Sequence, residues 1–349
     1  MTVVTATVPS SGCRRRGAAA SASAAVMAAV GGGVAPAVER HGDVLNTHLD
    51  LWGWEVAAYL FLGGLAAGLL IVASWAVLAG RRREYLPAVR VATLLVPPLI
   101  GAGLVLLWLD LGSKLTPFWL YVTLRPTSPM SWGAWILLAV LLTSSLAAIP
   151  ALLAMRARAS VPCRLPRLHR VLEHVGRWAA RHGRWLAWIN LWLGVGLGLY
   201  TGILLGTMVA RPAWNSPMLG PLFLASGLSG AVALLLLLRP RGPWAPVFVR
   251  AEVGLHATKL ALLGLYLTGL ATSGAAPQAA AAALVRGVWA PAFWTLVVGA
   301  GMAVPLAVGL REVTVHRCPR RLAVASCTLA LAGGLALRVV LVYAGQHGL

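Results

Sequence analysis

Long apolar stretches alternate with short polar connections along most of the chain. A helix needs about 20 mainly apolar residues to cross a hydrocarbon core roughly 30 Å thick. Eight stretches meet this requirement, so the pattern predicts an all-α integral membrane protein with eight transmembrane helices. The predicted spans are Trp54 to Ala79, Val91 to Leu109, Ser131 to Ala154, Trp185 to Ala210, Met218 to Leu238, Glu252 to Ser273, Ala290 to Leu310 and Leu322 to Ala344.

The third connection has a different pattern. Apolar side chains recur there at helical spacing and arginines fill the gaps, which is typical of a helix lying on a membrane surface rich in anionic lipid. We therefore expect an amphipathic helix at about residues 164–184 on the inner leaflet; a docking site for a cytoplasmic partner is the alternative. The apolar positions are Leu168, Val171, Leu172, Val175 and Trp178.

Residues 1–45 are rich in Ala, Ser and Gly and too weakly apolar for a ninth span. The order Arg14-Arg15-Arg16, a mildly apolar stretch and Ala35-Pro-Ala37 is similar to a signal peptide. A disordered tail, or extra residues before a true start at Met27, explains the same composition. The predicted domain organisation is a tail over 1–45 and a membrane domain over 46–349.

Charge gives the orientation. The chain has 29 Lys+Arg against 9 Asp+Glu, a net charge of +20. Nineteen arginines fall in the first, third, fifth and seventh connections, and only four basic residues fall in the second, fourth and sixth. The positive-inside rule then places the odd connections in the cytoplasm and both termini in the periplasm. Since orientation accounts for the charge, nucleic acid is not needed as a partner.

Composition also limits the chemistry. Hydrophobic residues make up 59% and charged residues 11% of the chain, which leaves little for a soluble catalytic domain. The four cysteines lack the spacing of an iron–sulfur motif. A haem held between spans needs two histidines inside the membrane, and only His256 lies within a predicted span. We therefore expect no haem, no iron–sulfur cluster and no metal site in this chain.

A few polar residues lie close to the predicted outer face. Glu55 and Tyr59 lie at the start of the first span, and Asp110 ends the second. Arg338 lies towards the outer end of the eighth. Ionisable groups at membrane depth usually face a bundle interior or a cavity. Either Arg338 pairs with Asp110 or Glu55 as a structural ion pair, or the group forms a pocket that binds a polar headgroup and exchanges protons with it.

The sixth span carries a second polar group. Glu252, His256 and Lys259 are spaced i, i+4 and i+7, which places them on one helix face. With the span starting at Glu252, Lys259 would lie about 10 Å inside it. Snorkelling and ion pairing explain Glu252 without a function; the alternative for the whole face is a proton path.

An internal repeat precedes two of the spans. Arg125-Pro-Thr-Ser-Pro-Met130 leads into the third span, and Arg211-Pro-Ala-Trp-Asn-Ser-Pro-Met218 leads into the fifth. Both lie in outer connections. Helix capping alone does not require the Arg-Pro pair and the Met, so we expect the repeat to form a defined outer surface.

These motifs together resemble the NrfD/PsrC family of membrane subunits in polysulfide-reductase-type complexes. The resemblance covers about residues 50 to 345. It rests on Trp52-Gly-Trp54, Tyr59-Leu-Phe-Leu-Gly-Gly-Leu-Ala-Ala-Gly68, Leu109-Asp-Leu-Gly112, Arg125-Pro-Thr-Ser-Pro-Met-Ser-Trp-Gly-Ala-Trp135, Arg211-Pro-Ala-Trp-Asn-Ser-Pro-Met218 and Phe223-Leu-Ala-Ser-Gly227.

The resemblance implies a haem-free protein of eight helices, in two four-helix-bundle-like halves, in the cytoplasmic (inner) membrane of a bacterium or archaeon. It implies menaquinone or ubiquinone bound near the periplasmic face. It also implies a ferredoxin-like iron–sulfur partner subunit, itself attached to a molybdopterin or multihaem catalytic subunit.

Carried over to this sequence, the resemblance predicts a role for each outer residue. Tyr59 would donate a hydrogen bond to a quinone carbonyl. Glu55 and Asp110 would accept protons as catalytic bases. Candidates for the pocket wall or the partner surface are Trp108, Trp119, Ser128 and Met130. Family members commonly have His or Asn in this part of the first helix, where this chain has Val56 and Tyr59.

Two other classes of function fit the same pattern. A structural anchor would hold an electron-transfer subunit without quinone chemistry. A proton- or ion-coupled secondary transporter would also have eight helices and internal repeats, but its repeats would break helices near mid-membrane, whereas this repeat lies at the outer surface.

Overall fold

Eight membrane helices make up the body of the protein. The computed structural model describes residues 52–81, 85–110, 128–158, 166–208, 210–238, 244–315 and 319–347. The spans are α3 (Trp54–Leu78), α4 (Leu86–Asp110), α6 (Pro129–Arg158), α8 (Gly183–Gly206), α9 (Leu219–Leu238), α10 (Ala245–Thr272), a composite seventh span over Ala290–Val315, and α14 (Arg320–His347). The prediction of an all-α protein with eight spans is confirmed. The predicted tail over 1–45 lies outside the described residues.

The seventh span is the irregular one. It begins as α12 (Ala290–Ala292), continues as a π-helix, η1 (Phe293–Ala303), and ends as α13 (Val304–Val315). Two helices lie between spans: α7 (Pro166–Arg181) in the third connection and α11 (Ala275–Arg286) in the sixth. Sequence periodicity did not reveal η1 or α11, because a π-helix departs from the 3.6-residue period and the alanine run in α11 has no polar face to mark it.

The predicted start of the sixth span was wrong by seven residues. Helix α10 begins at Ala245, with Pro246 at the first turn where its missing N–H costs nothing, and Arg250 is an exposed residue of the helix. Lys259 therefore lies 14 residues, or about 21 Å, from the helix start. It is near the middle of the span rather than in its inner part.

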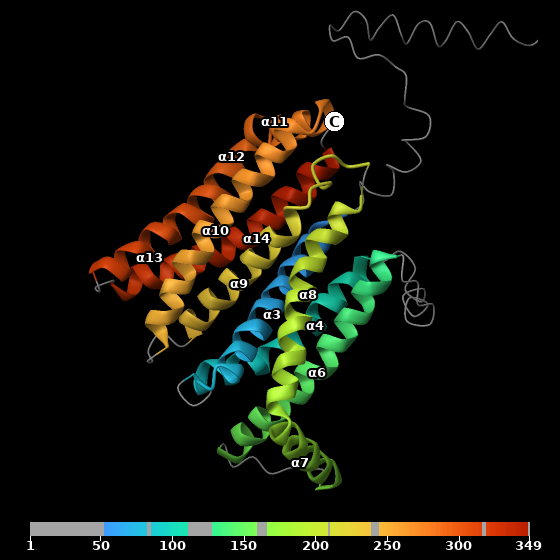
Figure 1. Cartoon of the computed structure of the whole chain (residues 1–349), viewed down its shortest axis with the longest axis vertical. Coiled ribbons are helices and arrows are strands. Elements are labelled where there is room, and N and C mark those ends of the chain that lie inside the picture. Colours follow the sequence, from blue (N-terminus) through green and yellow to red (C-terminus); the bar gives the residue numbers. More distant parts are fainter. Residues whose placement is uncertain are drawn as a thin grey trace, which may run out of the picture. The chain divides into compact units, whose positions relative to one another are not determined.

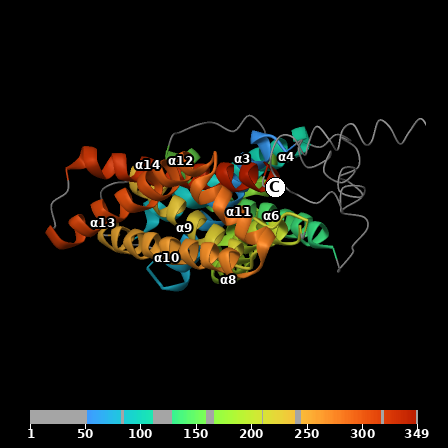
Figure 2. The ribbon, with the colours of Figure 1, turned by 90° about the horizontal axis from the view of Figure 1, so that it is seen from above.

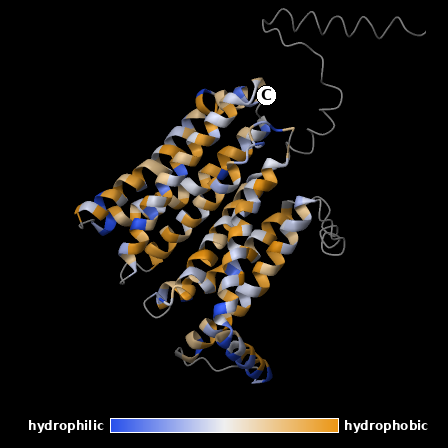
Figure 3. Cartoon of the chain, viewed as in Figure 1, coloured by the Kyte–Doolittle hydropathy of each residue, from blue (hydrophilic) through white to orange (hydrophobic). Residues whose placement is uncertain are grey.

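The spans form two four-helix groups that pack side by side (Figures 1 and 2). Helices α3, α4, α6 and α8 form the first half, and α9, α10, η1 with α13, and α14 form the second. Two helices of the first half join it to the second: α3 packs against α9 and α14, and α8 packs against α9. Apolar residues run the length of the helices, and the most hydrophilic segment in Figure 3 is α7.

Glycines allow α3 and α9 to approach closely. A Cβ atom on Gly68 would lie 2.3 Å from the Gly227 carbonyl oxygen, and one on Gly227 would lie 2.3 Å from the Gly64 carbonyl oxygen. A Cβ on Gly63, by contrast, would meet no atom within 4 Å. Close backbone approach at small residues is the usual way in which membrane helices pack without a hydrophobic driving force. Gly64, Gly68 and Gly227 thus hold the two halves together.

The C-terminal ends of α3, α6, α9 and α13 all lie at one end of the bundle, the end that carries α7 (Figure 1). We call it the basic end because nineteen arginines fall in the first, third, fifth and seventh connections predicted from the sequence. The end with Trp54, Ser128 and α11 is the opposite end. That the basic end faces the cytoplasm, with both termini outside, stays a prediction from the positive-inside rule.

Candidate functional site

At the opposite end, the first half brings several of the predicted quinone residues onto adjacent helices. Tyr59 lies one turn after Glu55 on α3, and α4 packs beside them and carries Trp108, which is 45% exposed. A Cβ on Gly103 of α4 would lie 3.9 Å from the Tyr59 carbonyl oxygen, so the two helices are close at this level. Residues with phenol, carboxylate and indole groups therefore lie at the same end of the α3–α4 pair.

Glu55 has a local structural role as well. It lies in the first turn of α3, where a carboxylate interacts favourably with the helix dipole. Its side chain folds back over Gly53, since a Cβ atom at that residue would lie 2.2 Å from the Glu55 carboxylate. The side chain of Asp110 and the whole of Trp119 lie outside the described residues, so their predicted roles are not tested.

The repeated motif begins two helices in the same way. In the first copy the Ser131 N–H donates to the Ser128 carbonyl oxygen (3.1 Å), and in the second the Leu219 N–H donates to the Ser216 carbonyl oxygen (3.3 Å). Ser128 is half-buried at the start of α6, and Met130 is 52% exposed. Both residues lie at the same end as Tyr59, on the helix that packs against α4.

The second copy of the motif is tied firmly to the second half. Trp214 is fully buried, stacks on Trp52 at 5.3 Å between ring centroids, and donates its indole N–H to the Leu341 carbonyl oxygen (2.7 Å). Arg211 donates to the Gln346 carbonyl oxygen, and the Tyr266 hydroxyl donates to the Ala213 carbonyl oxygen (2.6 Å). This segment forms a fixed surface at the opposite end.

Arg338 is fully buried between α3, α9 and α14 and does not pair with Glu55. Its guanidinium donates to the carbonyl oxygens of Leu60 (3.1 Å), Gly334 (2.8 Å) and Phe223 (3.3 Å) and to the Ser226 hydroxyl (3.0 Å). It also lies over the rings of Phe61 and Phe223. The positive charge is held by backbone carbonyls and ring faces instead of a carboxylate.

Glu252, His256 and Lys259 lie together inside the second half, where the helix-face argument placed them. They are 7%, 0% and 2% exposed. The Lys259 ammonium donates to the Ser229 hydroxyl of α9 (2.9 Å), and this hydroxyl donates to Glu252 Oε1 (2.9 Å). His256 Nδ1 lies 2.9 Å from the Glu252 carbonyl oxygen and 3.4 Å from Oε1. Snorkelling does not explain these residues, because none of them reaches the surface.

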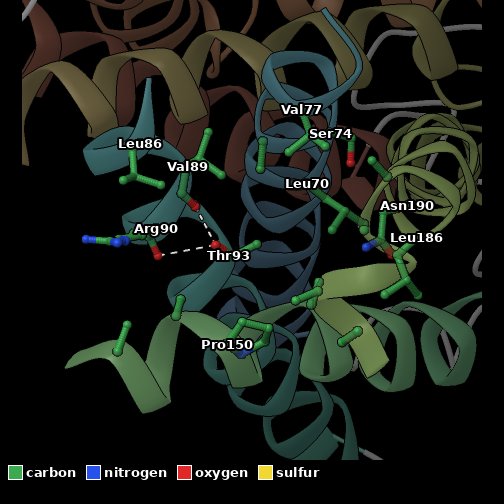
Figure 4. Close-up of a pocket in the computed structure, with 18 residues that line it drawn as sticks. Leu70, Ser74, Val77, Leu86, Val89, Arg90, Thr93, Pro150, Leu186 and Asn190 are labelled. Carbon is green, nitrogen blue, oxygen red and sulfur yellow. Dashed lines mark hydrogen bonds between the residues drawn. The ribbon is translucent and has the colours of Figure 1, made fainter. Parts of the chain in front are cut away.

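Two cavities lie towards the basic end, one in each half. The first, of about 130 Å³, is bounded by α3, α4, α6, α7 and α8 (Figure 4). The Thr93 hydroxyl donates to the carbonyl oxygens of Val89 and Arg90 in its own helix. In Figure 4 the Arg90 guanidinium points away from the other lining residues, and Asn190 lies on the opposite side of the cavity from Arg90. Asn190 is 3% exposed and its Oδ1 has no hydrogen-bond partner. Neither cavity reaches Tyr59 or Glu55.

The second cavity, of about 80 Å³, is bounded by α9, α10, α13 and α14. Four of its lining residues are polar or charged, Glu252, Glu312, Arg320 and Ser326. Glu312 lies one turn before the end of α13, and Arg320 begins α14, so both lie at the basic end. Sequence reasoning missed Ser229, Glu312 and Asn190. A serine pair three residues apart in the apolar α9 was the one available signal.

The fold and these groups define a multi-pass membrane protein with polar sites inside both halves. In the described part of the chain, no cluster of three or more His, Cys, Asp or Glu could hold a metal ion.

The particular family follows from sequence comparison. Residues 44–349 match the family described as "Polysulphide reductase, NrfD", and the chain belongs to this family. It is 34% identical to Protein NrfD of Escherichia coli over 316 residues, which cover 85% of this chain and 95% of that protein.

Two further relatives are similar over comparable lengths. A polysulfide reductase subunit of Wolinella succinogenes is 28% identical over 319 residues, which cover 87% of this chain and 97% of that protein. The Protein NrfD homolog of Haemophilus influenzae is 28% identical over 312 residues, covering 85% and 94%. The family resemblance is thus confirmed, and the protein is a multi-pass protein of the bacterial inner membrane and a membrane subunit of the polysulfide- or nitrite-reductase type.

Proposed function

We propose that this protein binds menaquinone or ubiquinone at the end opposite the basic end and exchanges electrons between it and a ferredoxin-like iron–sulfur partner subunit. The observation that supports the proposal is that Glu55 and Tyr59 on α3 and Trp108 on α4 all lie at that end of two adjacent helices. The names of the relatives support it, since the Wolinella succinogenes relative is by name part of a polysulfide reductase. The partner in turn would attach to a molybdopterin or multihaem catalytic subunit.

The residues fit a quinone headgroup in their chemistry. A quinone presents two carbonyl oxygens that need donors, and the Tyr59 hydroxyl and the Trp108 indole are donors in apolar surroundings. Glu55 and Asp110 are the proposed catalytic bases that take up or return protons. Trp119, Ser128 and Met130 are the proposed wall or partner surface. The bound quinone would supply the two-electron, two-proton chemistry, while the protein binds it, orients it and exchanges its protons.

The proposal is tested by binding and by electron transfer in the purified complex. Tyr59→Phe removes one neutral hydrogen bond, worth about 1 kcal/mol, so the Kd of a quinone-site inhibitor should rise about five-fold. Glu55→Gln and Asp110→Asn should slow quinol-linked electron transfer at least ten-fold with the Kd little changed. Tyr343→Phe is the matched control, because Tyr343 is a half-buried tyrosine near the same end of α14 that stacks on Trp289.

Two outcomes contradict the proposal. If the wild-type complex shows no saturable inhibitor binding, the protein is a structural anchor. If Tyr59→Phe and Tyr343→Phe have equal effects, Tyr59 does not contact the quinone. Substrate uptake into vesicles that contain this protein alone would instead favour a transporter.

A further inference from the structure

A hydrogen-bonded relay crosses from α10 to α9 and back inside the second half. Lys259 donates to the Ser229 hydroxyl, and this hydroxyl donates to Glu252, each at 2.9 Å. Ser229 is fully buried, and the other two residues are at most 7% exposed. The donors point one way, from ammonium through hydroxyl to carboxylate. This is the arrangement expected after one proton has passed from Glu252 to Lys259.

The reverse arrangement needs no movement of the backbone. A neutral Glu252 carboxyl would donate to Ser229 Oγ while the Ser229 hydroxyl donates to a neutral Lys259 amine. Passing between the two states breaks and forms only O–H and N–H bonds, and one proton is carried for each cycle. A hydroxyl that both accepts and donates is the group such a relay requires.

One buried carboxylate oxygen at this relay lacks a partner. Glu252 Oε2 forms no hydrogen bond, although it is buried. An unsatisfied buried polar atom costs about 1–3 kcal/mol, so it needs an explanation. The His256 ring does not supply a donor to it, because backbone carbonyl oxygens of Glu252 and Gly301 lie against that ring. Glu252 Oε2 is an acceptor, and water is a donor that suits it.

The second cavity supplies a route for that water. It includes Glu252 among its lining residues, and Glu312 and Arg320 line it at the basic end. A water molecule needs roughly 10–15 Å³ measured in this way, so about 80 Å³ holds several. We call this cavity the vestibule. It lies between the basic end and Glu252.

Positive charge lies on the other side of the relay. Arg338 bonds Ser226, one turn from Ser229 on α9, and also bonds the Leu60 carbonyl oxygen on α3, next to Tyr59. Its fixed charge opposes the passage of a cation or proton beyond Lys259. The relay is thus open towards the basic end and blocked towards the opposite end.

We propose that the vestibule, Glu252, Ser229 and Lys259 form a proton half-path that loads a proton from the basic end to the middle of the membrane. Glu252 is the entry carboxyl, Ser229 the relay and Lys259 the inner acceptor. His256 lies beside Glu252, with its Nδ1 2.9 Å from the Glu252 carbonyl oxygen. The half-path itself does not depend on the proposed quinone function. Its coupling to electron transfer does rest on that function, because negative charge on a reduced quinone near Tyr59 would be needed to offset the positive charge of Arg338.

Water access is tested without any turnover. In a variant with Cys13, Cys163, Cys318 and Cys327 changed to Ser, Ser326→Cys places a thiol at a buried position that lines the vestibule, and Ala325→Cys places one on the exposed outer side of the same turn. A charged, membrane-impermeant thiol reagent applied at the basic end should modify Ser326→Cys at least ten-fold faster. Equal rates for the two thiols would overturn the vestibule.

The relay is tested in the complete complex reconstituted in vesicles, with a pH indicator on the basic-end side. Ser229→Ala removes the relay hydroxyl but neither charge, so proton uptake per electron should fall at least ten-fold while inhibitor binding stays unchanged. Ser226, one turn away on α9, accepts a hydrogen bond from Arg338 and is not part of the relay. The control variant Ser226→Ala should therefore retain wild-type proton uptake. Glu252→Gln should match Ser229→Ala, and Thr258→Val, on the exposed side of α10, should match wild type.

Wild-type proton uptake in Ser229→Ala or Glu252→Gln would overturn the half-path. Failure of inhibitor binding in the wild-type complex would contradict the quinone proposal alone, and the two thiol rates would then decide the half-path by themselves.

Discussion

The two halves of the bundle both have a cavity near the basic end, but the groups behind the cavities differ. In the first half the buried polar residues at the cavity are Ser74 and Asn190, and in the second half they are Ser326 and Glu252, of which Glu252 alone carries a titratable group. Among the described residues, every buried charged side chain belongs to the second half or to the segment leading into it; these are Arg211, Glu252, Lys259 and Arg338.

The difference matters because an amide cannot carry a proton and a carboxyl can. Both groups have an unsatisfied oxygen, so water can approach either one. Only in the second half would such a water lie next to a buried carboxyl that is hydrogen-bonded onward, through Ser229 to Lys259. The first half thus provides the predicted quinone residues at the opposite end, and the second half provides the buried charges.

The largest expected effect comes from separating the halves. Gly68→Ala places a Cβ atom 2.3 Å from the Gly227 carbonyl oxygen, so α3 and α9 would have to move apart. Overpacking costs typically 1–3 kcal/mol and more against rigid backbone. We expect the full-length protein to be lost from the detergent-soluble fraction, measured by size-exclusion chromatography of a fluorescent fusion.

Gly63→Ala is the control for this prediction. Gly63 is on the same helix, and a Cβ there would meet no atom within 4 Å. If both variants are equally unstable, the close α3–α9 contact is not what joins the halves.

A smaller effect is expected at the fixed surface of the second half. Trp214→Phe keeps most of the stacking on Trp52 but loses the bond to the Leu341 carbonyl oxygen. The lost bond and the vacated volume should lower the free energy of unfolding by about 1–2 kcal/mol, which thermal unfolding in detergent would detect. Trp188→Phe, at an exposed position of α8, should leave the transition unchanged. A larger shift for Trp188→Phe would contradict this account.

The smallest effect is expected at Asn190. Asn190→Leu removes a buried amide whose oxygen is unsatisfied, so stability should change by less than about 1 kcal/mol in either direction. Proton uptake and electron transfer should equal those of wild type, measured in the same vesicles as the Ser229→Ala variant. Loss of proton uptake in Asn190→Leu would show that the first half also conducts, and the contrast between the halves would disappear.

Much of this arrangement could be predicted from the sequence. Hydrophobic length was sufficient for the eight spans, and the i, i+4, i+7 spacing was sufficient to put Glu252, His256 and Lys259 on one face. The depth of Lys259 in the membrane was harder to predict. Arg250 suggested a connection before the sixth span, although it lies on the exposed side of α10.

Partners across helices could not be predicted in the same way. One of the two alternatives for Arg338 was an ion pair with Asp110 or Glu55, yet its guanidinium is bonded mainly by backbone carbonyl oxygens, which every sequence supplies equally. Likewise, the sequence of α9 does not specify that Ser229 accepts a hydrogen bond from Lys259 of α10. Such contacts depend on how α9, α10 and α14 are rotated against one another, and single-sequence periodicity does not determine rotation between helices.

The π-helix η1 has a consequence for how the length of the seventh span can vary. Each π turn contains an extra residue relative to an α turn, and single π-bulges in helices frequently mark functional sites. Over Phe293–Ala303 the chain therefore holds more residues than its axial length requires. Deleting one residue there can be absorbed by converting a π turn to an α turn, with α13 and its Glu312 left in place. Relatives of different length could thus share one architecture around the same buried charges.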